Sequence, residues 1–144
     1  MGLVAFLLFL VGALYYIWNG SNDFDKRKWF KFFLGFIASL IGVFVLGFIF
    51  KGVTALLPAF SDKIAGGLLM KIFMSVFSVL GMKFVVAMAC TIFSKIMAFH
   101  RKYNTENYDK LSSFAYRLAP GLLLLAKILV SLGGVLAFYG IWLA

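Results

Sequence analysis

Three lysines at equal intervals interrupt the longest apolar stretch of this chain, Ile64 to Phe99. Lys71 and Lys95 would lie roughly 36 Å apart along one α-helix, because each residue adds about 1.5 Å. That length slightly exceeds the hydrocarbon thickness of a bilayer, about 30 Å, so both ammonium groups can reach opposite headgroup layers. We therefore predict a membrane-spanning helix whose ends are marked by Lys71 and Lys95 and whose middle holds Lys83.

The composition also indicates a membrane-embedded chain. Of 144 residues, 64% are hydrophobic and 13% are charged. An ordinary soluble domain is about half apolar and about a quarter charged, so this chain has too little polar surface to cover a water-soluble globule. Spans of about 20 apolar residues account for most of the length, which predicts a single membrane domain, residues 1–144, of the all-α class.

We predict a compact bundle of four transmembrane helices without a soluble domain or a repeat at the level of the sequence. The aromatic residue Trp18 anchors the end of the first span at the interface, and turn-forming residues follow it. Pro120 opens or kinks the fourth span. The predicted spans cover residues 2–18, 29–50, 66–98 and 120–142.

The basic residues predict the orientation. The chain carries 14 Lys and Arg against 5 Asp and Glu, a net charge of +9. The Lys and Arg residues cluster in and beside two of the predicted loops, 19–28 and 99–117. The positive-inside rule therefore places these loops in the cytoplasm and both termini outside an inner or plasma membrane. No soluble basic module is present to hold a duplex, so no nucleic-acid partner is expected. The residues expected to contact anionic lipids are Lys26, Arg27, Lys28, Arg101 and Lys102.

Lys83 is the sharpest candidate for a functional residue. A charged lysine at the membrane centre costs roughly 2.5–3.5 kcal/mol and is expected to face a partner or a watery cavity. All five acidic residues lie in predicted loops, so the chain offers no obvious carboxylate at the depth of Lys83. Its side chain must therefore be neutral, hydrated in a cavity, bound to backbone carbonyls, or paired with another chain.

The helix around Lys83 has one aromatic face and one polar face. At about 100° per residue, Phe73, Phe77 and Phe84 share one arc, and the polar residues lie on the remaining side. The residues predicted to face a pore or a partner are Lys83, Ser75, Ser78, Ser94 and Lys71. The alternative is that the serines bond to their own backbone while Lys83 bends toward one headgroup layer.

Small residues recur at helical spacing in two other spans. Such strips let another helix approach closely, although glycine is also generally enriched in membrane helices. The residues predicted to pack against other helices are Gly35, Ser39, Gly42, Gly133 and Gly134.

The sequence contains no motif for catalysis, and we expect no enzymatic activity, cofactor or metal. Cys90 lies deep in a span without a nearby histidine, which favours a packing role. The expected function is an oligomeric channel or pore-like assembly in which Lys83 lines or gates the path. One alternative is an accessory subunit of a larger secretion, transport or respiratory complex, in which Lys83 meets an acid of a partner. Another is a membrane immunity or exclusion protein. The expected partners are the lipid bilayer, further copies of the chain, or other membrane subunits.

Overall fold

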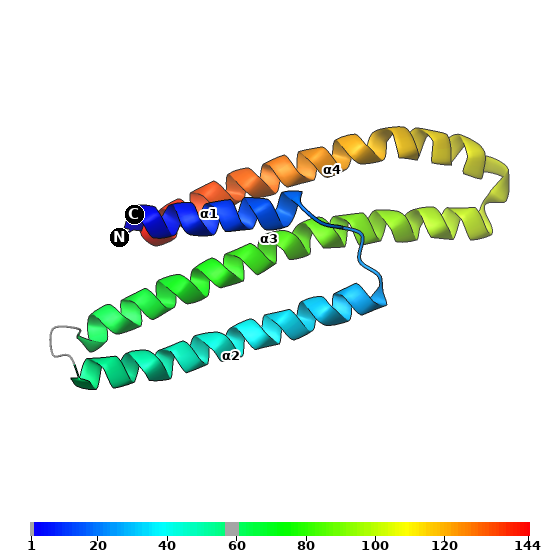
Figure 1. Cartoon of the computed structure of the whole chain (residues 1–144). Helices are drawn as coiled ribbons and strands as arrows, with labels where there is room; N and C mark the ends of the chain where they lie inside the picture. Colours follow the sequence, from blue (N-terminus) through cyan, green and yellow to red (C-terminus); the bar gives the residue numbers. More distant parts are fainter. Residues whose placement is uncertain (1, 57–60) are drawn as a thin grey trace.

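Four α-helices make up the chain in the computed structural model, which describes residues 2–56 and 61–144, apart from the side chains of residues 106, 107 and 111. They are α1 (Gly2–Trp18), α2 (Lys26–Leu56), α3 (Asp62–Tyr103) and α4 (Thr105–Trp142). The described residues contain no strand, and the predicted all-α membrane bundle is confirmed (Figure 1). α2, α3 and most of α4 are long and apolar enough to cross a membrane, whereas α1 is shorter, at 17 residues.

Two of the helix starts have a local cause in the sequence. The Asp25 carboxylate accepts a hydrogen bond from the backbone N–H of Lys28 at 2.7 Å and thereby caps the start of α2. Ser61 is the N-cap of α3, and its hydroxyl accepts from the N–H of Ile64 at 3.4 Å. Asp62 in the first turn of α3 complements the positive end of the helix dipole.

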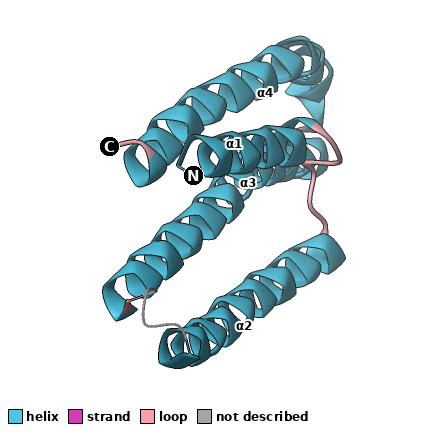
Figure 2. Cartoon of the chain, turned by 60° about the vertical axis from the view of Figure 1, so that its left-hand side comes forward, coloured by secondary structure: helices cyan, strands magenta, loops and turns pink. Residues whose placement is uncertain are grey.

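Among the described residues, helices α1, α3 and α4 pack against one another, while α2 packs against α3 alone (Figures 1 and 2). α1 and α3 run in one direction, and α2 and α4 run in the other. The two termini lie side by side at one end of this arrangement. Gly2 makes that approach feasible, because a Cβ atom there would lie 2.6 Å from the carbonyl oxygen of Trp142.

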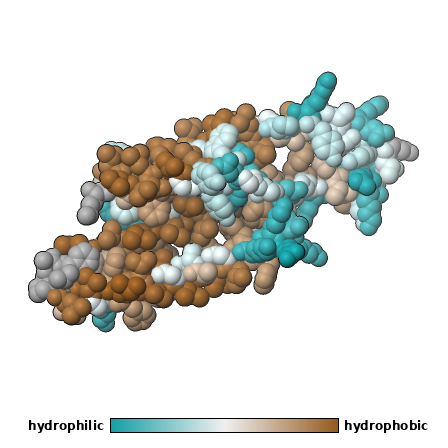
Figure 3. All heavy atoms as spheres, in the orientation of Figure 1, coloured by the Kyte–Doolittle hydropathy of each residue, from teal (hydrophilic) through white to brown (hydrophobic). Residues whose placement is uncertain are grey.

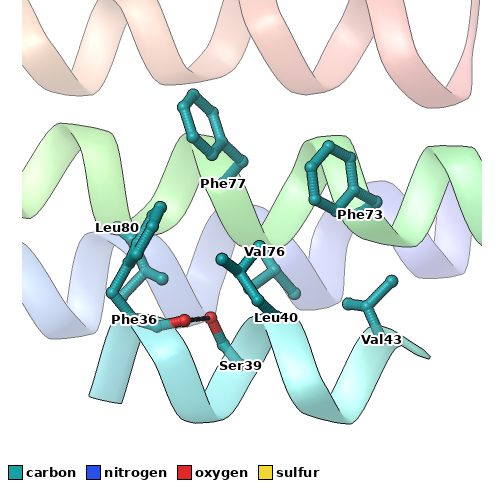
Figure 4. Close-up of a pocket in the computed structure, with 8 residues that line it drawn as sticks. All are labelled: Phe36, Ser39, Leu40, Val43, Phe73, Val76, Phe77 and Leu80. Atoms are coloured by element: carbon teal, nitrogen blue, oxygen red, sulfur yellow. Dashed lines mark hydrogen bonds between the residues drawn. The ribbon is translucent and has the colours of Figure 1, made fainter. Parts of the chain in front are cut away.

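The interface between α2 and α3 is filled by side chains (Figure 4). The cavity it leaves measures about 10 Å³, which is room for about one water molecule. Near the start of α2, the Trp29 ring lies 5.6 Å from the Phe84 ring, so α2 begins level with the middle of α3. The cavity is lined by Phe36, Ser39, Leu40 and Val43 of α2 and by Phe73, Val76, Phe77 and Leu80 of α3.

The stretch 99–117, expected as a loop, is helical except at Asn104. α3 continues to Tyr103, and α4 begins at Thr105, so the two helices form a tight hairpin. Pro120 therefore lies inside α4 rather than at its start. Its ring nitrogen cannot donate a helical hydrogen bond, a known cause of bending, and α4 is curved in its first half (Figure 1).

Candidate functional site

The ammonium group of Lys83 has its partners within the same chain. Its Nζ donates to the carbonyl oxygen of Tyr16 at 3.0 Å and to the Oδ1 of Asn22 at 2.7 Å. It also lies 5.0 Å from the centroid of the Tyr16 ring, and the Lys83 side chain is only 3% exposed. Of the four states left open by the sequence, the structure thus shows binding to a backbone carbonyl, together with a side-chain amide that the sequence reasoning missed.

The position of Tyr16 explains why a cation is stable there. Tyr16 lies in the last turn of α1, where carbonyl groups lack partners within the helix and form the negative end of the dipole. Gly20, with φ +83°, lets the chain turn directly after this helix. The turn brings Asn22, which is 6% exposed, against α3. Lys83 therefore joins the end of α1 to the connecting segment, which we define as residues 19–25.

Further polar contacts fix the connecting segment along the middle of α3. The Ser94 hydroxyl donates to Oδ1 of Asp23 at 3.4 Å. From the other side, the ammonium of Lys28 donates to the Ser21 hydroxyl at 3.1 Å and to the carbonyl oxygen of Asp23 at 3.0 Å. A charged and polar segment therefore lies beside α3 from the level of Lys83 to that of Ser94.

A tryptophan clamp holds the end of α1 on α4. The Trp18 indole N–H donates to the Ser131 hydroxyl at 3.2 Å, and that hydroxyl donates to the carbonyl oxygen of Lys127 at 2.7 Å. The Lys127 ammonium lies 5.4 Å from the centroid of the Trp18 ring, a distance at which the ring face attracts a cation. These three residues form the first clamp.

The same arrangement recurs at the end of α4. The Trp142 indole N–H donates to the Ser75 hydroxyl at 2.8 Å, and that hydroxyl donates to the carbonyl oxygen of Lys71 at 2.8 Å. The Lys71 ammonium lies 5.8 Å from the centroid of the Trp142 ring. This second clamp binds α4 to α3, just as the first clamp binds α1 to α4.

Both clamps have a signature that was present in the sequence. A Tyr-x-Ile-Trp run ends α1 at Trp18 and recurs at Trp142, and a Lys-x-x-x-Ser spacing is shared by Lys71 with Ser75 and by Lys127 with Ser131. In an α-helix this spacing places the serine one turn after the lysine, where its hydroxyl can bond the lysine carbonyl. The chain therefore contains a short local repeat, which the sequence reasoning overlooked.

Replacing either clamp tryptophan with phenylalanine should lower the free energy of unfolding by about 1–2 kcal/mol. The change removes the indole N–H and weakens attraction to the lysine while it keeps an aromatic ring. Trp29→Phe is the matched control, because Trp29 packs through ring contacts with Phe24, Phe32 and Phe33. Unfolding in a detergent titration checks this, and equal losses for Trp18, Trp142 and Trp29 would contradict the role of the clamps.

The five residues predicted to face a pore or a partner lie in different surroundings in the structure. Lys71 and fully buried Ser75 belong to the second clamp, and Lys83 binds the end of α1. Ser94 is exposed and bonds the connecting segment, while Ser78 is half-buried on α3. The predicted return of hydrogen bonds to the helix backbone is observed for Ser75. A role of these residues in a pore or at a partner remains a prediction.

Some of the residues predicted to pack against other helices face a helix of this chain, and others do not. A Cβ atom added at Gly134 would overlap the end of the Met82 side chain, which would have to move to make room, so Gly134 lies at the contact between α4 and α3. Ser39 faces α3 (Figure 4). Gly35, Gly42 and Gly133 have no atom within 4 Å of an added Cβ, which leaves them open to contacts from outside this chain.

The residues predicted to contact anionic lipids are exposed, although two already have partners in the chain. Lys28 bonds the connecting segment, and the Lys102 ammonium lies 5.0 Å from the centroid of the Tyr103 ring. Lys26, Arg27 and Arg101 are exposed at the same part of the molecule, where Figure 3 shows hydrophilic surface over the start of α2 and the α3–α4 junction. At the left of Figure 3, over the opposite ends of the helices, the coloured surface is mainly hydrophobic.

An apolar groove of about 570 Å³ runs between α3 and α4 beyond the point where α1 ends. Its volume is within the range of small-molecule sites, about 300–1,000 Å³. Asp23 and Ser94 supply polar groups at its wall. A smaller cavity of about 220 Å³ shares Phe93 and Ser94 with the groove and is lined by Arg101 further along. The other residues lining the groove are Ala89, Cys90, Ile92, Ile96, Ala119, Pro120, Leu122, Leu123 and Ala126.

A comparison of the chain with protein-family models, curated proteins and solved structures finds no match.

Proposed function

We propose that this chain is a non-enzymatic accessory subunit of a larger membrane complex, with a hairpin of α3 and α4 that stands beyond the hydrocarbon layer and binds other subunits. The observation that carries the proposal is the position of the connecting segment beside the middle of α3, through Asn22 on Lys83 and Asp23 on Ser94. Its asparagine and aspartate side chains belong in water or among headgroups.

The level of the connecting segment indicates where the bilayer ends. Trp29 is a residue type that anchors at the interface, and its ring contacts Phe84. The proposed hydrocarbon boundary thus passes within about one helical turn of Lys83, in contrast to the midplane position inferred from the spacing of the lysines. The helix turn after Lys83 covers residues 84–88. About 20 helical residues span the hydrocarbon, so the opposite boundary would fall at residues 64–68. Lys63 lies just outside it, and Lys71 lies close enough for its long side chain to reach the headgroups.

On this placement the α3–α4 hairpin stands well clear of the hydrocarbon. α3 continues from Ala89 to Tyr103, roughly 22 Å beyond the boundary. The polar headgroup layer accounts for only about 5–8 Å of that length. The hairpin nevertheless exposes large apolar side chains, such as Ile96 at 50%, Phe99 at 59% and Phe114 at 64%. Apolar surface of this kind, rimmed by charge, is typical of a surface that binds another protein.

The burial of Lys83 favours an accessory subunit over a pore. A lysine that lines an ion path needs its ammonium in contact with water or ions, whereas this one is 3% exposed and has two oxygen acceptors and a ring. The exposure of α2 supports the same choice, because α3 is the one described helix that α2 contacts, and Gly35 and Gly42 are left open. Under this proposal, other membrane helices cover α2, and other subunits cover the hairpin.

Native mass spectrometry of the protein, extracted gently from its own membrane, tests the proposal. The expected result is a mass that contains one or more different subunits together with this chain. Deleting those subunits should reduce its abundance, because its exposed apolar surface would then lose its cover. A single homo-oligomeric mass without foreign subunits would favour the pore instead and would overturn the accessory role.

A further inference from the structure

We infer that the cavity lined by Arg101, Tyr108 and Tyr116, where α3 ends and α4 begins, is a binding site for a phosphate group. Such a site would add to the accessory role without depending on it, because a single chain forms it. Two observations carry the assignment: the hydrogen-bond donors that two helices bring to the cavity, and the positive charge of the hairpin around it.

The cavity lies between the two arms of the α3–α4 hairpin. Its wall on α3 runs from Phe93 to Arg101, and Tyr108 and Tyr116 form its wall on α4. Its volume of about 220 Å³ is roughly twenty times that of the water-sized cavity between α2 and α3. A ligand group much larger than water can therefore enter between the two helices. The lining residues with apolar side chains are Phe93, Met97 and Ala98.

Arg101 and the two tyrosines supply donors from both helices. Arg101 forms no hydrogen bond or ion pair with any side chain that the structure describes, so its five N–H donors are open to a ligand. The hydroxyls of Tyr108 and Tyr116 hydrogen-bond to each other. That bond uses one of the two O–H donors, so the other is available as well. Ser94 also lines the cavity, but its hydroxyl donates to Asp23.

A phosphate group matches this set of donors. A guanidinium binds two phosphate oxygens side by side in a bidentate pair. Because phosphate is tetrahedral, a further oxygen points away from that pair and can accept from a phenol on the facing helix. A carboxylate has two oxygens in one plane, and a bidentate pair with Arg101 would occupy both. The donors on two helices therefore favour phosphate.

The charge around the cavity suits an anion. The stretch 95–117 carries five basic residues and two acidic ones, and no described residue that lines the cavity is acidic. The Asp109 carboxylate acts on Tyr108 from outside the cavity. A single arginine next to neutral phenols is best matched by one negative charge. The expected ligand group is therefore a phosphate diester rather than a doubly charged monoester.

A phosphate diester can come from a membrane lipid or from a soluble molecule. On the placement proposed above, Arg101 lies about 18 Å beyond the hydrocarbon boundary, counted along the helix from Ala89. The headgroup layer extends only about 5–8 Å beyond that boundary. A lipid phosphate at its usual depth would not reach the cavity, so we expect a soluble ligand.

Calorimetric titration of the full chain, purified in a phosphate-free maltoside detergent, tests this site. The probes are glycerophosphoglycerol and dihexanoyl phosphatidylglycerol, which carry the same phosphate diester without and with acyl chains. Both should bind, with dissociation constants within about threefold of each other. Arg101→Gln should weaken the binding of both at least about tenfold, because it removes the charge and the bidentate fork. Lys102→Gln removes the same charge from a neighbour outside the cavity and should change the dissociation constants less than about twofold.

A second pair of variants tests the phenols. Tyr116→Phe keeps the ring but removes a hydroxyl, and it should weaken binding by about three- to fivefold. Tyr103→Phe is the matched control, because Tyr103 and Tyr116 are 64% and 62% exposed but Tyr103 does not line the cavity. Binding to Tyr103→Phe should therefore equal that of the unaltered chain.

The outcomes separate the two sources of the phosphate group. If the acylated probe binds at least about tenfold tighter and Arg101→Gln removes that binding, the site holds a lipid headgroup, and the soluble source is wrong. If neither probe binds, or if Arg101→Gln and Lys102→Gln weaken binding equally, the cavity is not a phosphate site. Neither result depends on which subunits are extracted with the chain, so the test of the accessory role is separate.

Discussion

Replacing Asn22 with leucine should lower the free energy of unfolding by about 2 kcal/mol, one of the two largest effects we expect in this chain. The substitution keeps the size of the side chain but removes the oxygen that accepts from Lys83 at 2.7 Å. A buried charge that loses a hydrogen-bond partner is costly, and bonds to charged groups contribute roughly 1.5–3 kcal/mol. Tryptophan fluorescence during a detergent titration measures the loss.

The companion variant, Lys83→Met, removes the ammonium group and with it the hydrogen bond to Asn22. Methionine keeps an unbranched apolar stem but carries no charge, so neither the ammonium nor its desolvation remains. The loss should be smaller than for Asn22→Leu, because the Tyr16 and Asn22 oxygens lie beside a polar segment that water can reach. The double variant Asn22→Leu/Lys83→Met should lose little more free energy of unfolding than Lys83→Met alone, since no buried ammonium is left without its partner.

The double-mutant cycle decides whether the two residues act together. A coupling energy above about 0.5 kcal/mol is expected for groups in direct contact. Asn19→Leu is the control, because Asn19 is an exposed amide in the same connecting segment. Strictly additive losses, or a loss at Asn19 as large as that at Asn22, would show that Lys83 does not depend on this bond. The case for a lysine free to line a pore would then return.

The helices themselves could be predicted from the sequence, because long apolar runs determine them locally. The runs ending at Trp18, beginning at Trp29 and containing Lys83 all became helices. The polar residues of 99–117 favour a loop, but this stretch is helical, because a helix that leaves the bilayer can carry polar residues equally well. Asn104 is its one non-helical residue.

The partners of Lys83 could not be predicted, because they depend on where a distant segment lies. Equal spacing of three lysines gives distances along one helix, but the depth of that helix depends on what packs beside it. Asn22 is 61 positions away in the sequence, and a lone asparagine in a turn carries no signal that it will turn inward. The tryptophan clamps are different, since the repeated Tyr-x-Ile-Trp run was visible in the sequence and could have been found by comparing the two ends of the chain.

The second large effect concerns the position of α3 in the bilayer and can be measured by cysteine labelling. In a Cys90→Ala background, single cysteines at Phe77, Ile92 and Phe99 would each be treated with a membrane-impermeant maleimide in lipid nanodiscs. All three side chains are at least 47% exposed in the chain itself, so burial by protein does not distinguish them. The cysteines at Ile92 and Phe99 should react at least about tenfold faster than that at Phe77, because the reactive thiolate forms poorly in hydrocarbon.

Ile92 is the residue that separates the two placements. With Lys83 at the midplane, Ile92 would lie about 13 Å from the centre and still within the hydrocarbon, whose half-thickness is about 15 Å. With the boundary within a turn of Lys83, Ile92 lies roughly 6–12 Å outside the hydrocarbon. Because Ile92 lines the groove, Leu125→Cys on α4 serves as a second position at about the same level that is 52% exposed and does not line it. Fast labelling at both positions would support the hairpin that stands beyond the bilayer. If the cysteines at both positions reacted as slowly as that at Phe77 while that at Phe99 reacted fast, Lys83 would lie near the midplane. The polar connecting segment would then have to enter the membrane to contact Lys83.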